Sequence, residues 1–107
     1  MWDWLMAQTK LRIHQMDSYS ELRILVNHPM ENGRNRDHND QLIPAHYIKS
    51  LKVFCNQTLL GKLDMSGSMS KNPFLVLQLD NLNSGDLIQI TWEDNLGQSD
   101  SADQVIP

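Results

Sequence analysis

The sequence of 107 residues is poor in several features that define common functional classes. It contains one cysteine, Cys55, so no disulfide can form within the chain, and cysteine usage does not reveal its redox compartment. Its longest apolar run, Phe74-Leu75-Val76-Leu77, is far too short to cross a bilayer. We therefore expect a single domain with no internal cross-link and no membrane span.

A surplus of positive charge is also missing. The formal net charge is -4 and the pI is near 5.4, with basic residues scattered along the chain. This gives no footprint for the phosphate backbone of a nucleic acid. No nucleophile elbow, phosphate-binding glycine loop or metal motif frames the Ser, His and Asp residues, so we expect that the protein is not an enzyme.

What the sequence does contain is apolar residues at alternate positions, the period of a half-buried β-strand. The segments with this pattern are marked by Leu11 and Ile13; Leu22, Ile24 and Val26; Tyr47, Leu51, Val53 and Cys55; Leu59, Gly61, Leu63 and Met65; Phe74 to Leu77; Ile88, Ile90 and Trp92; and a weaker stretch ending at Val105. They predict an all-β fold, an immunoglobulin-like β-sandwich of about seven antiparallel strands. We expect one such domain over residues 9–107, after a disordered N-terminal extension of residues 1–8.

Two of these segments depart from simple alternation. Lys49 is a polar residue among the apolar positions of the third segment. The fifth segment, starting at Phe74, is apolar on both faces, which suits a central strand or a strand that a partner covers.

Two side-chain types invite a chemical interpretation. Cys55 shares a strand face with Leu51 and Val53, where a thiol behaves as a small hydrophobe, although a thiol at a strand end can also be partly exposed. The histidines are His14, His28, His38 and His46. They lack the H-x₃₋₅-H spacing of zinc ligands and have no second cysteine beside them. We interpret Cys55 as structural and the histidines as surface or turn residues, with neither a metal site nor a cofactor.

One connection is longer than the usual ~4–6 residues, the polar stretch between Val26 and Ala45. Its first half carries Glu31, Arg34, Arg36 and Asp37. On composition alone this is a solvated loop whose ion pairs contribute little. The alternative is a polar rim around Met30 and Ile43 that docks a partner, because Met and Arg are enriched at interfaces.

Three ordered blocks of residues carry a resemblance to a known family. The blocks are His28-Pro29-Met30-Glu31-Asn32-Gly33-Arg34-Asn35-Arg36-Asp37 with Leu42-Ile43-Pro44-Ala45-His46-Tyr47; Lys71-Asn72-Pro73-Phe74-Leu75; and Gly85-Asp86 with Ile88, Ile90, Trp92 and Asp94-Asn95-Leu96-Gly97. From about Thr9 to Gly97 the chain resembles the SoxZ family, the non-catalytic half of the SoxYZ carrier of bacterial thiosulfate oxidation.

The resemblance implies a heterodimer with a SoxY-like subunit, and transient contacts with the other sulfur-oxidation enzymes. In SoxY the sulfur-carrying cysteine lies on a C-terminal Gly-Gly-Cys-Gly-Gly arm, whereas this chain ends Asp103-Gln104-Val105-Ile106-Pro107. Met1 to Leu5 carry no cationic segment of a secretory signal. Because SoxZ proteins reach the periplasm together with SoxY, the resemblance implies a periplasmic location by co-export. The expected partner-binding residues are Met30, Glu31, Gly33, Arg34, Arg36, Ile43, Pro44, Asn72, Pro73 and Phe74.

At one hairpin the chain departs from this family. SoxZ proteins commonly have Asn-Gly after the third strand, and this chain has Asn56-Gln57. Because glutamine tolerates a positive φ poorly, we expect a different turn type here.

Two other classes of function stay open at this point. One is a monomeric β-sandwich module that binds a small molecule or a sulfur species through Cys55. The other is an enzyme with its site in the long loop. Slow reaction of Cys55 in a thiol titration favours the subunit interpretation over the first, and substrate turnover by the isolated chain would favour the second.

Overall fold

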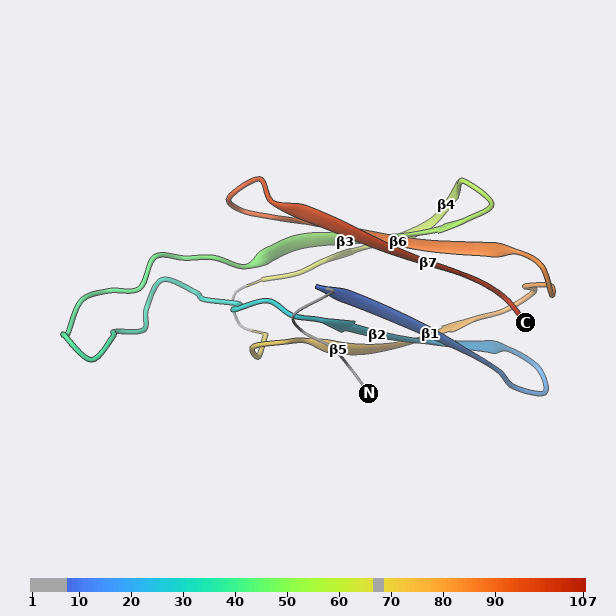
Figure 1. Cartoon of the computed structure of the whole chain (residues 1–107), viewed down its shortest axis with the longest axis horizontal. Coiled ribbons are helices and arrows are strands. Elements are labelled where there is room, and N and C mark those ends of the chain that lie inside the picture. Colours follow the sequence, from blue (N-terminus) through green and yellow to red (C-terminus); the bar gives the residue numbers. More distant parts are fainter. Residues whose placement is uncertain (1–7, 67–68) are drawn as a thin grey trace.

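The computed structural model describes residues 8–66 and 69–107, and in them seven antiparallel strands form two stacked sheets (Figure 1). The strands are β1 (Thr9–Gln15), β2 (Ser20–Val26), β3 (Ile48–Cys55), β4 (Thr58–Asp64), β5 (Phe74–Leu79), β6 (Leu87–Asp94) and β7 (Ser99–Val105). One sheet has the order β1-β2-β5 and the other β4-β3-β6-β7. The all-β sandwich predicted from the sequence is confirmed.

The expected N-terminal extension, residues 1–8, lies outside the described residues except for Gln8. Within the described ranges, no helix is long and apolar enough to span a membrane.

The core lies between the two sheets and is built from the alternating residues. Its fully buried members include Leu22, Ile24, Val26, Ile48, Leu51, Ile88 and Ile90. Burying each such side chain contributes about 1.5–3 kcal/mol relative to exposure, and this fixes which face of each strand points inward.

A bulge explains the polar residue in the third strand. Ile48 pairs with Asp94 and Ser50 pairs with Glu93, so Lys49 is an extra residue in β3. The bulge turns Lys49 to solvent, where its Nζ lies 3.4 Å from Glu93 Oε1, while Ile48 and Leu51 both face the core.

The expected change of turn type after β3 is wrong. Cys55 pairs with Thr58, and the two residues between them have positive φ, 49° at Asn56 and 72° at Gln57, as in a type I′ hairpin. The Asn56 side chain accepts a hydrogen bond from Leu87 N at 2.9 Å and donates one to Asp86 Oδ1 at 3.0 Å. These contacts and the strand pairing hold Gln57 in a conformation that its own preference opposes.

The fifth strand is an edge strand, so one of its two expected settings, a central position, is wrong. Its outer-face residues Phe74 and Val76 are 55% and 52% exposed. The alternate residues of the strand, Leu75 and Leu77, point inward but are only partly buried. The apolar pattern on both faces therefore reflects an incompletely covered strand.

Candidate functional site

The most distinctive feature of the surface is an arm, residues 32–45, that projects from one end of the sandwich (Figure 1). At its base Glu31 and His46 exchange two backbone hydrogen bonds of 2.7 and 2.9 Å. Further out, Ile43 N donates to Asn35 O at 2.8 Å, and the backbones of Arg36 and Leu42 form an isolated antiparallel β-bridge. The long connection is thus a narrow, irregular hairpin rather than an open loop.

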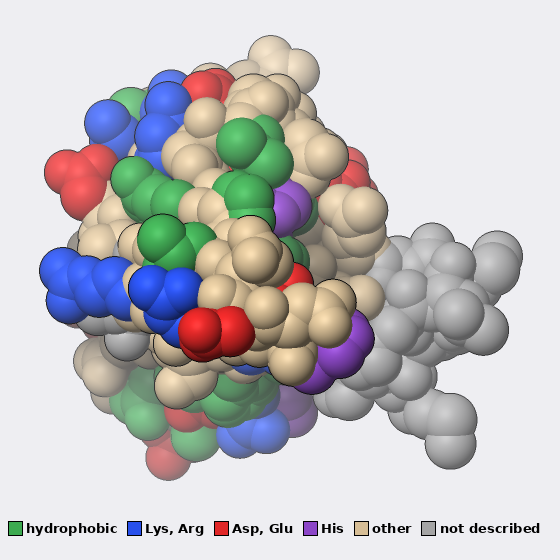
Figure 2. Space-filling model, turned by 90° about the vertical axis from the view of Figure 1, so that its left-hand side faces the viewer, with side chains coloured by type: hydrophobic (Ala, Val, Ile, Leu, Met, Phe, Trp, Pro, Cys, Tyr) green, Lys and Arg blue, Asp and Glu red, His purple; other side chains and the backbone are tan. Residues whose placement is uncertain are grey.

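The tip of the arm is closed by its own side chains. Asp37 Oδ1 accepts hydrogen bonds from the backbone N–H groups of Asn39 and Gln41, at 2.8 and 3.0 Å. Arg36 Nη1 donates to the Asp40 carbonyl at 2.9 Å. Most side chains of the arm are exposed. Figure 2 looks onto this end of the molecule, where Lys and Arg side chains gather at one side next to hydrophobic side chains.

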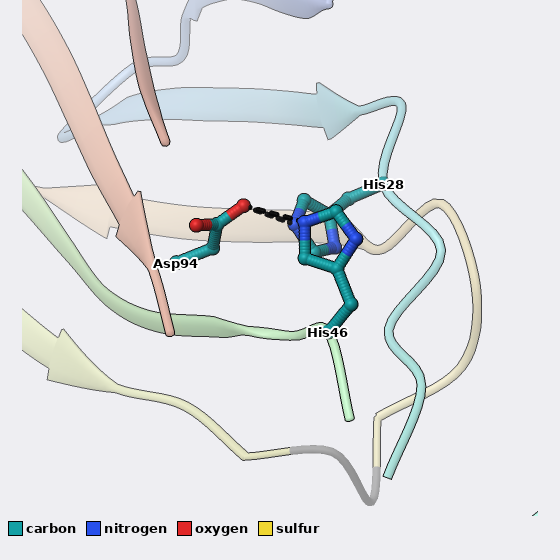
Figure 3. A group of neighbouring side chains, drawn as sticks. All are labelled: His28, His46 and Asp94. Carbon is teal, nitrogen blue, oxygen red and sulfur yellow. Dashed lines mark hydrogen bonds and ion pairs between the residues drawn. The ribbon is translucent and has the colours of Figure 1, made fainter. Parts of the chain in front are cut away.

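A group of three side chains, of which His28 and Asp94 are buried and His46 is partly buried, is here called the anchor and holds the base of the arm (Figure 3). His28 follows β2, His46 precedes β3, and Asp94 ends β6. Asp94 Oδ2 lies 3.1 Å from His28 Nε2 and 2.7 Å from His46 Nε2, and its side chain is 0% exposed. Asp94 Oδ1 accepts hydrogen bonds from the backbone N–H groups of Leu96 and Gln98. The carboxylate is therefore satisfied by four donors.

The anchor corrects the interpretation of the histidines. His28 is buried, at 2% exposure, and its ring packs edge-on against His46 and Trp92 with centroids 4.5 and 5.3 Å away. No H-x₃₋₅-H spacing announces this pair, because the two histidines come from separate segments that only the stacked sheets bring together. A surface or turn setting is therefore wrong for His28.

The ligand atoms of the anchor lie within 4.8 Å of one another, a grouping that could hold a metal ion. The hydrogen bonds of His28 argue against that use. Met30 N donates to His28 Nδ1 at 3.1 Å, so Nδ1 carries the lone pair and Nε2 carries the proton that faces Asp94. A metal bound to Nε2 would require the ring proton to be on Nδ1. That N–H group would then face the N–H group of Met30, and two donors cannot form a hydrogen bond. The geometry fits a hydrogen-bonded anchor better than a metal centre.

The charges in the anchor follow from burial and hydrogen bonding. Burial alone would raise the pKa of Asp94, but the hydrogen bonds from His28, His46 and two backbone N–H groups outweigh it, and the pKa is lowered. Burial lowers the pKa of His28 by more than the hydrogen bond to Asp94 raises it. At neutral pH the group is thus an ionised carboxylate beside a neutral His28.

Two asparagines from the motif blocks complete the support of the arm. Asn95 Oδ1 accepts a hydrogen bond from Tyr47 N at 2.8 Å, and its Nδ2 donates to Ala45 O at 2.9 Å. Asn72 Oδ1 accepts one from His28 N at 3.0 Å, and Asn72 N donates to His28 O at 2.8 Å. All three motif blocks therefore meet at the base of the arm.

Gly33 has a steric role at this base. Its φ is +85°, which favours glycine, and a Cβ built on it would lie 3.3 Å from the Cβ of Ala45. The two strands of the arm approach closely here because neither residue has a larger side chain.

The structure divides the expected partner-binding residues into buried and exposed groups. Met30 is in the core at 4% exposure, where its Sδ accepts a 3.4 Å hydrogen bond from Ile48 N, so the expected surface position of Met30 is wrong. The buried or partly buried ones are Met30, Glu31, Gly33, Ile43, Asn72 and Pro73; the exposed ones are Arg34, Arg36, Pro44 and Phe74. Met30 is drawn inward because the chain turns there with φ of 50° before it enters the arm.

Sequence reasoning missed the anchor, although its members stand inside the motif blocks. His28, His46 and Asp94 each belong to a block whose role was assigned to the arm or to a hairpin. Their shared membership in the motif blocks is the signal that could have grouped them. Leu42, which is 56% exposed on the arm, was also missing from the expected partner-binding residues.

Cys55 lies at the opposite end of β3 from the anchor. It is partly buried and packs against the core. Burial raises the pKa of its thiol, and the nearby Asp86 carboxylate raises it further. The thiolate form is therefore disfavoured at neutral pH.

Fold and site together define an immunoglobulin-like β-sandwich protein with a polar arm held in place by buried hydrogen bonds. The chain belongs to the SoxZ family, because the family model described as sulphur oxidation protein SoxZ matches residues 9–105. It is thus a sulfur oxidation protein. No curated protein matches the chain.

Proposed function

We propose that the protein is the non-catalytic subunit of a SoxYZ-type carrier complex in the periplasm. It binds a SoxY-like subunit as a heterodimer and helps to present that subunit's cysteine-bound sulfur to the enzymes of thiosulfate oxidation. The match to SoxZ over residues 9–105 carries this proposal. The arm and β5 supply the surface on which such a subunit would act.

The arm is suited to recognition because it needs little ordering on binding. Its base is held by the anchor and its tip by Asp37, so few degrees of freedom are left to lose. Arg34 and Arg36 extend from it into solvent, and the Arg36–Asp40 ion pair, at 3.8 Å, is exposed and weak. The Arg34 guanidinium, and the N–H groups of Arg36 other than the one bonded to the Asp40 carbonyl, can therefore exchange water for carboxylate or carbonyl acceptors on a partner.

The alternative, a monomeric module that uses Cys55 as its reactive group, receives no support from the thiol. A sulfur carrier needs an accessible thiolate, and the environment of Cys55 raises its pKa. We expect that Cys55→Ala retains thiosulfate oxidation in a reconstituted assay and loses about 1 kcal/mol of stability from packing.

The proposal is tested by mixing the purified chain with the SoxY-like subunit of the same organism. Size-exclusion chromatography with light scattering should show one heterodimer, and omission of the chain should abolish thiosulfate oxidation by the reconstituted enzymes. Arg36→Ala should weaken the heterodimer, whereas the control His14→Ala, an exposed change on β1, should not. Two subunits that elute separately at micromolar concentrations would refute the assignment.

A further inference from the structure

The four edge strands of the sandwich are protected to different degrees. β1 carries Lys10 and Arg12, β7 carries Asp100 and Asp103, and β4 carries Lys62, Asp64 and a bulge at Leu60. Charges and bulges of this kind keep a free edge from pairing with another chain. β5 reads Phe-Leu-Val-Leu-Gln-Leu, with neither a charge nor a bulge. Among the described strands, β5 is thus the unprotected edge.

The direction of its hydrogen-bonding groups follows from the register with β2. Val26 N donates to Pro73 O at 3.1 Å, which makes these two residues a hydrogen-bonded pair. In an antiparallel ladder such pairs alternate, so Leu75, Leu77 and Leu79 bond to β2. The N–H and C=O groups of Phe74, Val76 and Gln78 therefore point away from the sheet, along the free edge.

The side chains beside this edge are apolar on both sides of the sheet. Phe74 and Val76 are more than half exposed on the outer face. On the inner face Leu75, Leu77 and Leu79 are only partly buried, because β5 is the outermost strand of its sheet. An added strand would cover both groups and supply the missing backbone partners.

We propose that a β-strand of the SoxY-like partner pairs with β5 and extends the three-stranded sheet, with apolar side chains opposite Phe74 and Val76. This inference rests on the proposed function and names the mode of docking. An extended strand is the occupant because only a row of alternating donors and acceptors complements the edge.

A second copy of this chain fits the edge less well. Antiparallel pairing of two β5 strands through their outward groups, from Phe74 to Gln78, sets Val76 opposite Val76 and Phe74 opposite Gln78, which leaves each aromatic ring against an amide. A register that matches Phe74 with Val76 runs into Pro73 and into Asn72, whose φ is 53°. A partner strand of different sequence has neither constraint.

Amide hydrogen exchange tests the inference on the unaltered protein. In the free chain the amides of Phe74, Val76 and Gln78 should exchange fast, while Leu75 and Leu77 are protected by β2. On addition of the SoxY-like subunit the first three should slow by about a hundredfold or more, as new ladder bonds form. Unchanged exchange at these three positions in a formed heterodimer would overturn the inference.

A matched pair of variants gives a second measurement. Gln78→Pro removes one outward N–H group. The residue before a proline must be extended, and Leu77 already is, because it lies in β5. Gln78→Ala removes the side chain and keeps the N–H group. We expect Gln78→Pro to weaken binding of the SoxY-like subunit about tenfold, and Gln78→Ala to leave it within about twofold.

The outcomes separate this inference from the proposed function. Wild-type binding with no effect of Gln78→Pro overturns strand pairing and leaves the carrier role intact. Absence of wild-type binding overturns both. A third outcome has three parts: the wild-type chain alone forms a dimer, Gln78→Pro makes that dimer monomeric, and heterodimer formation is unchanged by the variant. In that case the strand that pairs with β5 belongs to a second copy of this chain, and the inference is wrong.

Discussion

The base of the arm and the edge of β5 use the motif residues in opposite ways. At the base, His28 and His46 both meet the buried Asp94 carboxylate, which takes its hydrogen bonds from within the chain. At the edge, Phe74 and Val76 are turned outward, and their backbone groups have no partner strand in the described chain. The motif residues can therefore be turned inward at one place, where they support the fold, and outward at another, where we propose that they bind a partner. The difference is one of satisfied against unsatisfied groups.

The largest expected contrast comes from the same substitution made in both regions. Met30→Glu places an unpaired carboxylate in the core and removes a buried side chain, so it should cost about 5 kcal/mol, close to the whole stability of a small domain. Phe74→Glu changes an exposed position and should leave the unfolding free energy within about 0.5 kcal/mol while it weakens the heterodimer. Urea unfolding and a binding titration of both variants measure this. Equal loss of stability would erase the contrast between the two regions.

A smaller loss is expected when the acceptor of the anchor is removed. Asp94→Ala leaves two imidazoles and two backbone N–H groups without their shared acceptor, at a cost of about 3 kcal/mol in unfolding free energy. Asp103→Ala, on the exposed face of β7, is the matched control and should cost little. If Asp94→Ala were as stable as that control, the anchor would not contribute to folding.

The pH dependence of stability sharpens the comparison further. The pKa of His28 is lowered in the folded state, so between its folded value and the ordinary value near 6.5 the unfolded chain binds more protons. The contribution of neutral His28 is complete above that ordinary value and is lost as the pH falls through it. The lowered pKa of Asp94 extends the loss to more acidic pH.

This dependence is measured by urea unfolding between neutral pH and about pH 5. Stability should fall with pH, and His28→Gln should flatten the slope in the upper part of that range. His14→Gln, at an exposed position on β1, should keep the wild-type slope. A wild-type slope in His28→Gln would assign the acid sensitivity to other groups.

The smallest expected effect lies outside both regions. Gln57→Gly relieves the positive φ of 72° in the β3–β4 hairpin and should raise the unfolding free energy by about 1 kcal/mol. Neither partner binding nor the pH slope should change. A decrease in the melting temperature would show that the Gln57 side chain makes a contribution larger than its strain.

Single residues show where prediction from sequence ends. Leu22, Ile24 and Val26 are placed correctly by alternation because burial of one strand face is a local, repeated demand. The residues next to Phe74 in the sequence are apolar whether its strand is central or at an edge. The order of the strands in the sheet therefore cannot be predicted from this segment. Met30 looks like an interface residue by type, and its burial depends on where the chain turns.

The sequence by itself determined the seven strands, the two-layer class and the family, because periodicity and ordered motifs are properties of neighbouring residues. The tertiary structure decided which motif residues are buried and which are exposed. His28 and Asp94 are 66 residues apart, and their contact exists only because β2 and β6 lie in opposite sheets that stack at one end. The edge position of β5 likewise depends on pairing between strands that are distant in the sequence. Backbone hydrogen bonds form in the same way with any strand of suitable length, so they do not reveal from the sequence which strands are neighbours.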